Sequence, residues 1–290
     1  MQKRTNFIAV IFIVLILLNL LAWSAVFELK DAGKLKVVFF AVGQGDAAFI
    51  ETPGQNQILI DGGPNARVLE KLGEEMPFWD RTIDLIILTH PEQYHIAGLL
   101  EVLKRYKVEN ILWTAVVRDT AEYKEWQNLL KTEGARVFIA EAGETGMKMV
   151  KSEKPWNLAI LSPRENLSGK IMRDSNDTSV AARLVFGQTS FLFTGDLEKR
   201  GELELVNSGA NIDSDVLKVA HHGSKTSTVP EFISAVSPEF AVISAGKDNR
   251  YGHPHPQTLE TLQQYGAKIL RTDLDGDVTF VSDGLAIVVQ

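Results

Sequence analysis

Four short polar patches constrain what this chain can fold into, because each follows an apolar run of the length of a buried β-strand. The first patch follows residues 83–88 and places His90, Glu92 and His95 within six residues. All six histidines of the chain lie in three of these patches. Strand ends are rigid, so imidazole and carboxylate groups that leave several of them can converge on one cation. The other three patches are Thr194-Gly195-Asp196, His221-His222-Gly223-Ser224 and Gly252-His253-Pro254-His255.

The composition is that of a packed globular protein. Of the 290 residues, 45% are hydrophobic, which argues against disorder. The net charge of −7, with no run of basic residues, gives no electrostatic basis for tight, nonspecific binding to nucleic acid. There is no cysteine, so any metal must be held by nitrogen and oxygen ligands. Strand-like and helical runs alternate from residue 34 onward without a Gly/Ser-rich linker, which predicts one domain over residues 34–290, built of stacked sheets covered by helices.

The N-terminal part differs from the rest. Residues 7–27 are apolar except for Asn19 and Ser24, and 21 helical residues would span about 30 Å, the thickness of a bilayer core. Lys3 and Arg4 precede them, so the positive-inside tendency places the N-terminus in the cytoplasm. Residues 1–30 are therefore predicted to form a cytoplasmic tip and one transmembrane anchor, with the folded domain outside the cytoplasm. The alternative is a secretory signal cleaved near residues 22–25, which Trp23 disfavours.

The ordered set of motifs GQGD, DGG, TH-x-E-x-x-H, TGD, HHGS and GHPH resembles the metallo-β-lactamase fold. Within that fold, it resembles the soluble hydrolase domain of the ComEC competence proteins. The resemblance covers nearly everything from residue 34 to the C-terminus. It implies a four-layer αββα sandwich with a metal centre in the cleft between the sheet edges.

The resemblance also implies roles for individual residues. Asp196 matches the family's bridging carboxylate, although an Asp there is equally suited to capping a helix over residues 197–207. His221 is expected to bind the metal, with His222 orienting a ligand or the substrate. Either His253 or His255 is expected to face the cleft. The implied metal ligands are His90, Glu92, His95, Asp196 and His221, and the implied catalytic residues are Asp196, His222 and His253.

A further group is expected to bind substrate or to support the ligands. Asp61 ends a strand and is expected to accept hydrogen bonds from loop amides or from a ligand histidine, and Asp46 could do the same. For both, a plain turn role is the alternative. Ser224 can offer a hydroxyl to an anionic group. The group as a whole comprises Asp61, Tyr94, Asn176, Ser179, Ser224 and His255.

The histidine cluster departs from the family in one place. The family pattern is His-x-Asp-x-Asp-His, whereas here Glu92 replaces the first aspartate and Tyr94 the second. The lost aspartate would ordinarily bind a second metal, and a phenol with a pKa near 10 is a weak substitute. The change therefore leaves open a one-metal site as well as a weakened one.

These observations predict a membrane-anchored, metal-dependent hydrolase of phosphoesters. Its substrate would be a nucleic-acid strand or a phosphorylated small molecule, and its cofactor one or two zinc or manganese ions, with iron also compatible. The alternative, favoured by Tyr94, is a degenerate relative that keeps the fold as a binding module. A lactonase or thioesterase is a third reading of the fold.

Overall fold

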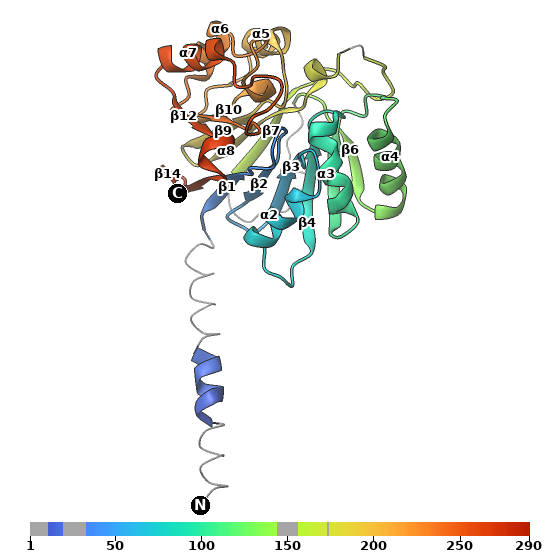
Figure 1. The fold of residues 1–290 in the computed structure, drawn as a ribbon, viewed down its shortest axis with the longest axis vertical. Coiled ribbons are helices and arrows are strands. Elements are labelled where there is room, and N and C mark those ends of the chain that lie inside the picture. Colours follow the sequence, from blue (N-terminus) through green and yellow to red (C-terminus); the bar gives the residue numbers. More distant parts are fainter. Residues whose placement is uncertain (1–10, 20–32, 144–155, 173) are drawn as a thin grey trace, which may run out of the picture.

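Two β-sheets stacked face to face form the centre of the molecule (Figure 1), in a computed structural model that describes residues 11–19, 33–143, 156–172 and 174–290. Within these residues the larger sheet has eight strands and the smaller has six. The larger sheet runs in the order β14 (Ile287–Val289), β13 (Val278–Ser282), β1 (Leu35–Phe39), β2 (Ala48–Glu51), β3 (Gln57–Ile60), β4 (Thr82–Leu88), β5 (Lys107–Trp113), β6 (Arg136–Ile139). The smaller runs in the order β12 (Lys268–Arg271), β11 (Phe240–Ile243), β10 (Val216–Lys218), β9 (Thr189–Phe193), β8 (Ala181–Phe186), β7 (Trp156–Ser162).

Helices cover the outer face of each sheet (Figure 1), which confirms the predicted αββα layering. The alternation of side chains along a strand explains the layers. In β4, Leu85 and Ile87 pack between the two sheets, while Ile86 and Leu88 pack under the helices. The larger sheet is covered by α2 (Arg67–Glu75), α3 (Gln93–Leu103) and α4 (Ala121–Glu133), and the smaller by α5 (Lys199–Asn207), α6 (Pro230–Val236) and α7 (Pro256–Gln264); the short α8 (Thr272–Asp275) follows β12.

Strand direction brings the polar patches together. Strands β3, β4 and β5 run parallel to one another, as do β9, β10 and β11 in the other sheet. The carboxyl ends of neighbouring parallel strands meet at one edge of a sheet, where ligand sites are commonly found. Asp61 and His90 follow β3 and β4, whereas Asp196 and His222 follow β9 and β10. The two sheets therefore present their polar patches at edges that face each other.

The predicted membrane anchor lies largely outside the described residues. Of residues 7–27, the structure describes residues 11–19, which are helical and whose large apolar side chains, such as Phe12, are exposed. Among the described residues, no helix has both the length and the apolar character that crossing a membrane requires.

Candidate metal centre

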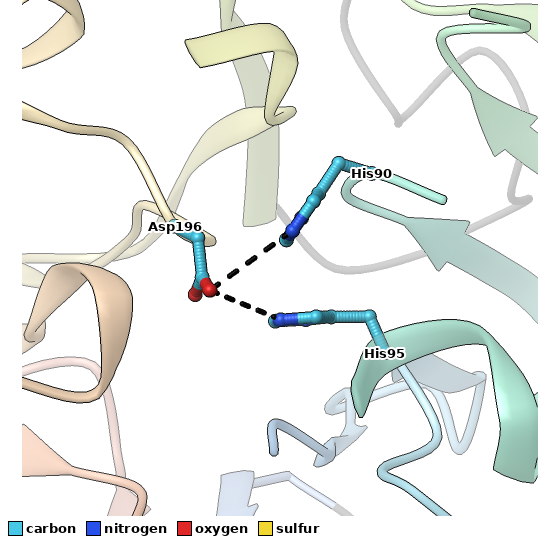
Figure 2. A group of neighbouring side chains, drawn as sticks. All are labelled: His90, His95 and Asp196. Carbon is cyan, nitrogen blue, oxygen red and sulfur yellow. Dashed lines mark ion pairs between the residues drawn. The ribbon is translucent and has the colours of Figure 1, made fainter. Parts of the chain in front are cut away.

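Three histidines and one aspartate converge at the facing sheet edges. The Nε2 atoms of His95 and His222 lie 3.3 Å and 3.4 Å from Oδ2 of Asp196, and Nε2 of His90 lies 4.0 Å from the same oxygen. Figure 2 shows His90 and His95 pointing toward Asp196 from the other sheet. All four side chains are buried, with exposed fractions of 4% or less. Three segments distant in sequence thus bring imidazole nitrogens close to one carboxylate.

The inward-facing atoms of this group have no hydrogen-bond partner. Nε2 of each histidine and Oδ1 of Asp196 are buried and unpaired among the described residues. Burying an unpaired polar atom costs roughly 1–3 kcal/mol, so four at one point need an explanation. A bound cation accounts for all of them at once.

The opposite nitrogen of each imidazole faces an oxygen that accepts its proton. Nδ1 of His95 lies 2.8 Å from Oδ2 of Asp61, and Nδ1 of His222 lies 3.0 Å from the carbonyl oxygen of Ser244. The hydroxyl of Thr89 donates to Asp61, so it accepts a hydrogen bond from Nδ1 of His90 at 3.1 Å. These contacts place the proton on Nδ1 and leave the Nε2 lone pair directed inward, as histidines that bind metals require.

The distances from Asp196 fit an ion that it shares with neighbouring histidines: Asp196 belongs to one cluster with metal-binding geometry that includes His90 and His95 and to another that includes His222 and Asp46. Two ligand atoms that each lie about 2.1 Å from a tetrahedral zinc are roughly 3.4 Å apart. The distances of 3.3 and 3.4 Å from Asp196 match this value, and the 4.0 Å distance to His90 requires a shift of about half an ångström. Three imidazoles and a carboxylate are a donor set that suits zinc and manganese. The chain thus has the ligands that the fold family's metal needs.

Charge at the site also favours a cation. Asp46, Asp61 and Asp196 are buried there beside one ammonium group of the described chain, that of Lys218. Lys218 follows Val216 on the inner face of β10 and forms an ion pair with Asp46. Three carboxylates and one ammonium leave two negative charges, which a divalent ion would balance.

The pKa shift of His95 reports the same negative field, whereas that of Asp46 reports the positive charge beside it. Burial lowers the pKa of His95, but the carboxylates of Asp196 and Asp61 outweigh it and raise that pKa well above its ordinary value. Burial raises the pKa of Asp46, yet Lys218 and His222 lower it to about 2. The pKa of His90 shifts in the opposite direction to that of His95, because burial and the neighbouring His95 lower it well below normal. The negative field that raises the pKa of His95 would equally attract a metal cation.

Ser179 and Gly195 position Asp196. The Ser179 hydroxyl accepts a hydrogen bond from the Asp196 backbone at 3.0 Å and lies 3.3 Å from Nδ1 of His90. Gly195 adopts a left-handed φ of 52°, and a Cβ there would lie 2.9 Å from Ser179 and 3.0 Å from Thr89. The turn into Asp196 therefore depends on glycine at position 195. The helix-capping alternative for Asp196 is wrong, because α5 begins at Lys199 with Glu198 as its N-cap.

Glu92 does not join the group, contrary to the sequence prediction. Its carboxylate accepts hydrogen bonds from Arg118 and Ser175, and its side chain is 30% exposed. No cluster with metal-binding geometry among the described residues includes it. Arg118 follows β5, a strand that the local sequence around Glu92 does not reveal as a neighbour.

His221 also lies apart from the cluster. Its Nδ1 is 3.3 Å from the carboxylate of Glu198, and its Nε2 is 3.5 Å from the amide of Asn176. Asn176 in turn donates to Glu198 at 3.3 Å, so these three residues form a polar rim beside the buried centre. The geometry therefore exchanges the expected roles of the two adjacent histidines, with His222 as ligand and His221 at the rim.

Tyr94 and His253 belong to the mouth of the site. The Tyr94 hydroxyl contacts the hydroxyl of Tyr251, and Arg250 donates to that tyrosine at 3.0 Å. The Tyr251 ring stacks on His253, whose ring centroid lies 6.4 Å from that of His222. Burial, together with His222 and His221, lowers the pKa of His253 to about 4. His253 is thus the histidine of its patch that faces the cleft.

His255 and Ser224 hold the loops around the site. The His255 side chain accepts a hydrogen bond from the backbone of Gln257 and so caps the start of α7. The Ser224 hydroxyl contacts the hydroxyl and the backbone N–H of Thr226. Neither side chain is placed by these contacts to touch a metal.

The loop that follows His222 depends on a buried acid with a raised pKa. Glu202 accepts hydrogen bonds from the backbone of Thr228 and Val229, and burial raises its pKa from 4.5 to about 7 despite these bonds. The folded state holds this proton more tightly than the unfolded chain. The stabilisation is therefore complete below pH 4.5 and is lost as the pH rises through 7.

We expect Glu202→Gln, which cannot ionise, to remove this pH dependence. Between pH 4.5 and 7.5 the free energy of unfolding of the wild type should fall, relative to that of the variant, by up to about 3 kcal/mol. Urea unfolding of both proteins at several pH values in the same buffers measures the difference. If the free energies of unfolding of the two proteins changed in parallel over that pH range, the raised pKa of Glu202 would be contradicted.

The site can be placed among known proteins. A family model for the metallo-β-lactamase superfamily matches residues 41–247, which contain Asp46, Asp61, the His90–His95 segment, Asp196 and His222. The chain belongs to the metallo-β-lactamase superfamily. The family resemblance found in the motifs is thereby confirmed.

Its relatives include competence proteins. The chain is 35% identical over 257 residues to ComE operon protein 3 of Bacillus subtilis, covering 82% of this chain and 32% of that protein. It is 30% identical over 253 residues to Recombination protein 2 of Haemophilus influenzae, covering 85% of this chain and 29% of that protein. The chain therefore spans about a third of the length of these two relatives.

Solved structures share the fold at low identity. Igni18, a novel metallo hydrolase from the archaeon Ignicoccus hospitalis, aligns with a TM-score of 0.54 and 17% identity over 84% of this chain and 98% of its own. A long form RNase Z from yeast aligns with a TM-score of 0.51 and 10% identity over 88% of this chain and 42% of its own. Both likenesses concern the fold alone.

Proposed function

We propose that this protein is a metal-dependent hydrolase that binds one divalent ion between His90, His95, His222 and Asp196. The observation that carries the proposal is that three buried Nε2 atoms without hydrogen-bond partners lie within 4.0 Å of the buried carboxylate of Asp196. In a purely structural cluster these buried atoms would form hydrogen bonds, and among the described residues they form none. Zinc and manganese are the ions that this donor set suits.

The ion and the surrounding residues would have different roles in hydrolysis. A divalent ion bound here would polarise a substrate oxygen and make a water more acidic. Asp61, Thr89 and Ser244 fix the orientation of the three histidines through their Nδ1 atoms. His253 has its pKa lowered to about 4 and is therefore neutral near pH 7, so at the mouth of the site it can contact substrate through its unpaired Nδ1 without adding a charge.

A phosphoester is the substrate class that we propose. The chain's relatives carry the names of competence and recombination proteins. At the mouth of the site, Arg250 and the hydroxyls of Tyr94 and Tyr251 supply donors suited to a phosphate oxygen. A nucleic-acid strand or a phosphorylated small molecule would meet these groups before reaching the buried ligands.

The test is metal content combined with hydrolysis. We expect the purified full-length chain to carry one divalent ion per molecule by elemental analysis and to cleave a chromogenic phosphodiester. A chelator should abolish the cleavage, and added zinc or manganese should restore it. A chain that stays metal-free and inert with both ions supplied would refute the proposal.

The same experiment separates a second candidate, a catalytically weak binding module. Tyr94 and Glu92 favour it, because their side chains contact Tyr251 and Arg118 rather than the centre. A chain that binds its metal but does not cleave any phosphodiester offered would support this candidate.

We further propose that residues 7–27 anchor the protein in a membrane as a single span, with the domain of residues 34–290 outside the cytoplasm. The support is the sequence itself, with 21 nearly unbroken apolar residues after Lys3 and Arg4. Of these, the described helix at residues 11–19 has exposed apolar side chains, so nothing in the described domain covers it.

A further inference from the structure

Two large aromatic side chains project into solvent from the loop between α2 and β4. Phe78 is 80% exposed and Trp79 is 67% exposed, and their rings contact each other edge to face with centroids 4.8 Å apart. Side chains of this size bury 150–250 Å² in a protein interior, so leaving two neighbours in water forgoes several kcal/mol. Such a pair marks a surface that something else covers.

The loop lies at the end of the domain where the chain enters. A groove of about 750 Å³ is lined by Trp79 together with Lys34 and Lys36, which flank the start of β1. In Figure 1 the loop between α2 and β4 reaches the lower end of the domain, the end from which β1 starts. Trp79 thus lies beside the point at which the polypeptide leads back to the apolar segment.

Chain length keeps this end close to that segment. Six residues lie between Phe27, the last residue of the segment, and Lys34, so seven residue-to-residue steps join the two. Even fully extended, these seven steps span at most about 25 Å, so the groove cannot lie far from a bilayer that holds residues 7–27. Indole and ammonium groups are the side chains that concentrate at the headgroup level of membrane proteins.

We propose that Phe78 and Trp79 insert into the interface of a lipid bilayer and hold the domain against it, an inference that rests on the proposed membrane anchor. Four acidic residues line the groove beside its two lysines, and one of them, Glu75, forms an ion pair with Lys36, so a zwitterionic headgroup fits the groove better than an anionic one. The occupant is therefore a zwitterionic bilayer surface.

Docking in this way fixes where the metal centre points. Strand β4 begins at Thr82, next to the aromatic loop, and its far end leads into His90. Seven strand residues rise roughly 23 Å, which separates the two ends of the sheet by about that length. The candidate centre would then face away from the membrane, and substrate would reach it from the aqueous side.

The absence of cysteine makes the proposal directly testable. Trp79→Cys and Phe78→Cys, made separately in the full-length chain, each give a single thiol for a nitroxide label, and each leaves the other aromatic ring in place. The matched control is Ile171→Cys, because Ile171 is 83% exposed and pairs with Val117 beyond the carboxyl end of β5, at the metal-site edge. Leu17→Cys reports on the apolar segment itself.

The readout is spin-label accessibility in phosphatidylcholine vesicles, measured as relaxation by oxygen, which partitions into lipid, against a water-soluble nickel complex. We expect the labels at positions 78 and 79 to shift toward oxygen, as at position 17, and the label at position 171 to stay on the nickel side. Labels at 78 and 79 that match the label at 171 would overturn the docking surface, whether or not Leu17 lies in lipid. A label at position 17 on the nickel side would refute the anchor, independently of the result at 78 and 79.

Discussion

The variant His222→Ala is expected to bind Zn²⁺ more than about 100-fold more weakly than the wild type, whereas His221→Ala should bind it within about threefold. The two residues are adjacent and chemically identical, so the comparison isolates geometry. Nε2 of His222 is unpaired and lies 3.4 Å from Asp196. The His221 ring contacts Glu198 and Asn176 instead. Losing one of four ligands should cost more than the 10–100-fold typical of a supporting residue.

Backbone geometry decides which of the two histidines points inward. Both adopt left-handed φ values, 50° for His221 and 54° for His222, which is uncommon for residues with a Cβ. This costs of order 1–3 kcal/mol per residue and persists where the surroundings enforce it. Here, the Ser244 carbonyl fixes the His222 ring from behind.

Competition with a chromogenic zinc chelator measures both affinities, and thermal unfolding confirms that each variant is folded. Equal losses in the two variants would mean that the whole loop, rather than one ring, supports the metal. A loss confined to His221→Ala would restore the assignment made from the sequence and contradict the structure.

Much of the architecture could be predicted from the sequence, because buried strands leave recognisable apolar runs and the polar residues of the site follow directly after them. The buried run that forms β4 and the placement of His90 and Asp196 just after strands follow from local patterns alone. The parallel direction of those strands then brings the patches to facing edges. The fold and the general position of the metal centre could therefore be predicted from the sequence.

The sequence could not predict which of several neighbouring polar residues face the metal centre, because contacts with distant segments decide this. Glu92 has a suitable carboxylate at suitable spacing, but Arg118 and Ser175 hold it away. Lys218 was missed altogether, although a lysine two residues after Val216 on the inner face of a buried strand was a usable signal. Such a charge needs a buried partner, which Asp46 provides.

The second large effect is expected at Gly98, within α3, where Gly98→Ala should destabilise the fold by about 3 kcal/mol or more. A Cβ at this position would lie 1.8 Å from the carbonyl oxygen of Gly62 and 2.8 Å from that of Asn65. Both obstacles are backbone atoms, so no side-chain rotation relieves the clash. The backbone N–H of Gly98 also donates to Gly63 at 3.0 Å, which ties the helix to this loop.

The clash should affect the geometry of the metal centre as well as the stability of the fold, because Asp61 begins the same loop and orients the His95 ring. Separating α3 from the loop would lengthen that 2.8 Å contact and release the imidazole. The matched control is Gly73→Ala in α2, where a Cβ would meet nothing within 4 Å. Removing a glycine from an open helical position should stabilise the protein by about 0.5–1 kcal/mol. Urea unfolding measures the free energy of unfolding of both variants. If Gly98→Ala were as stable as Gly73→Ala, α3 would not pack against the Asp61-Gly62-Gly63 loop as closely as these distances require.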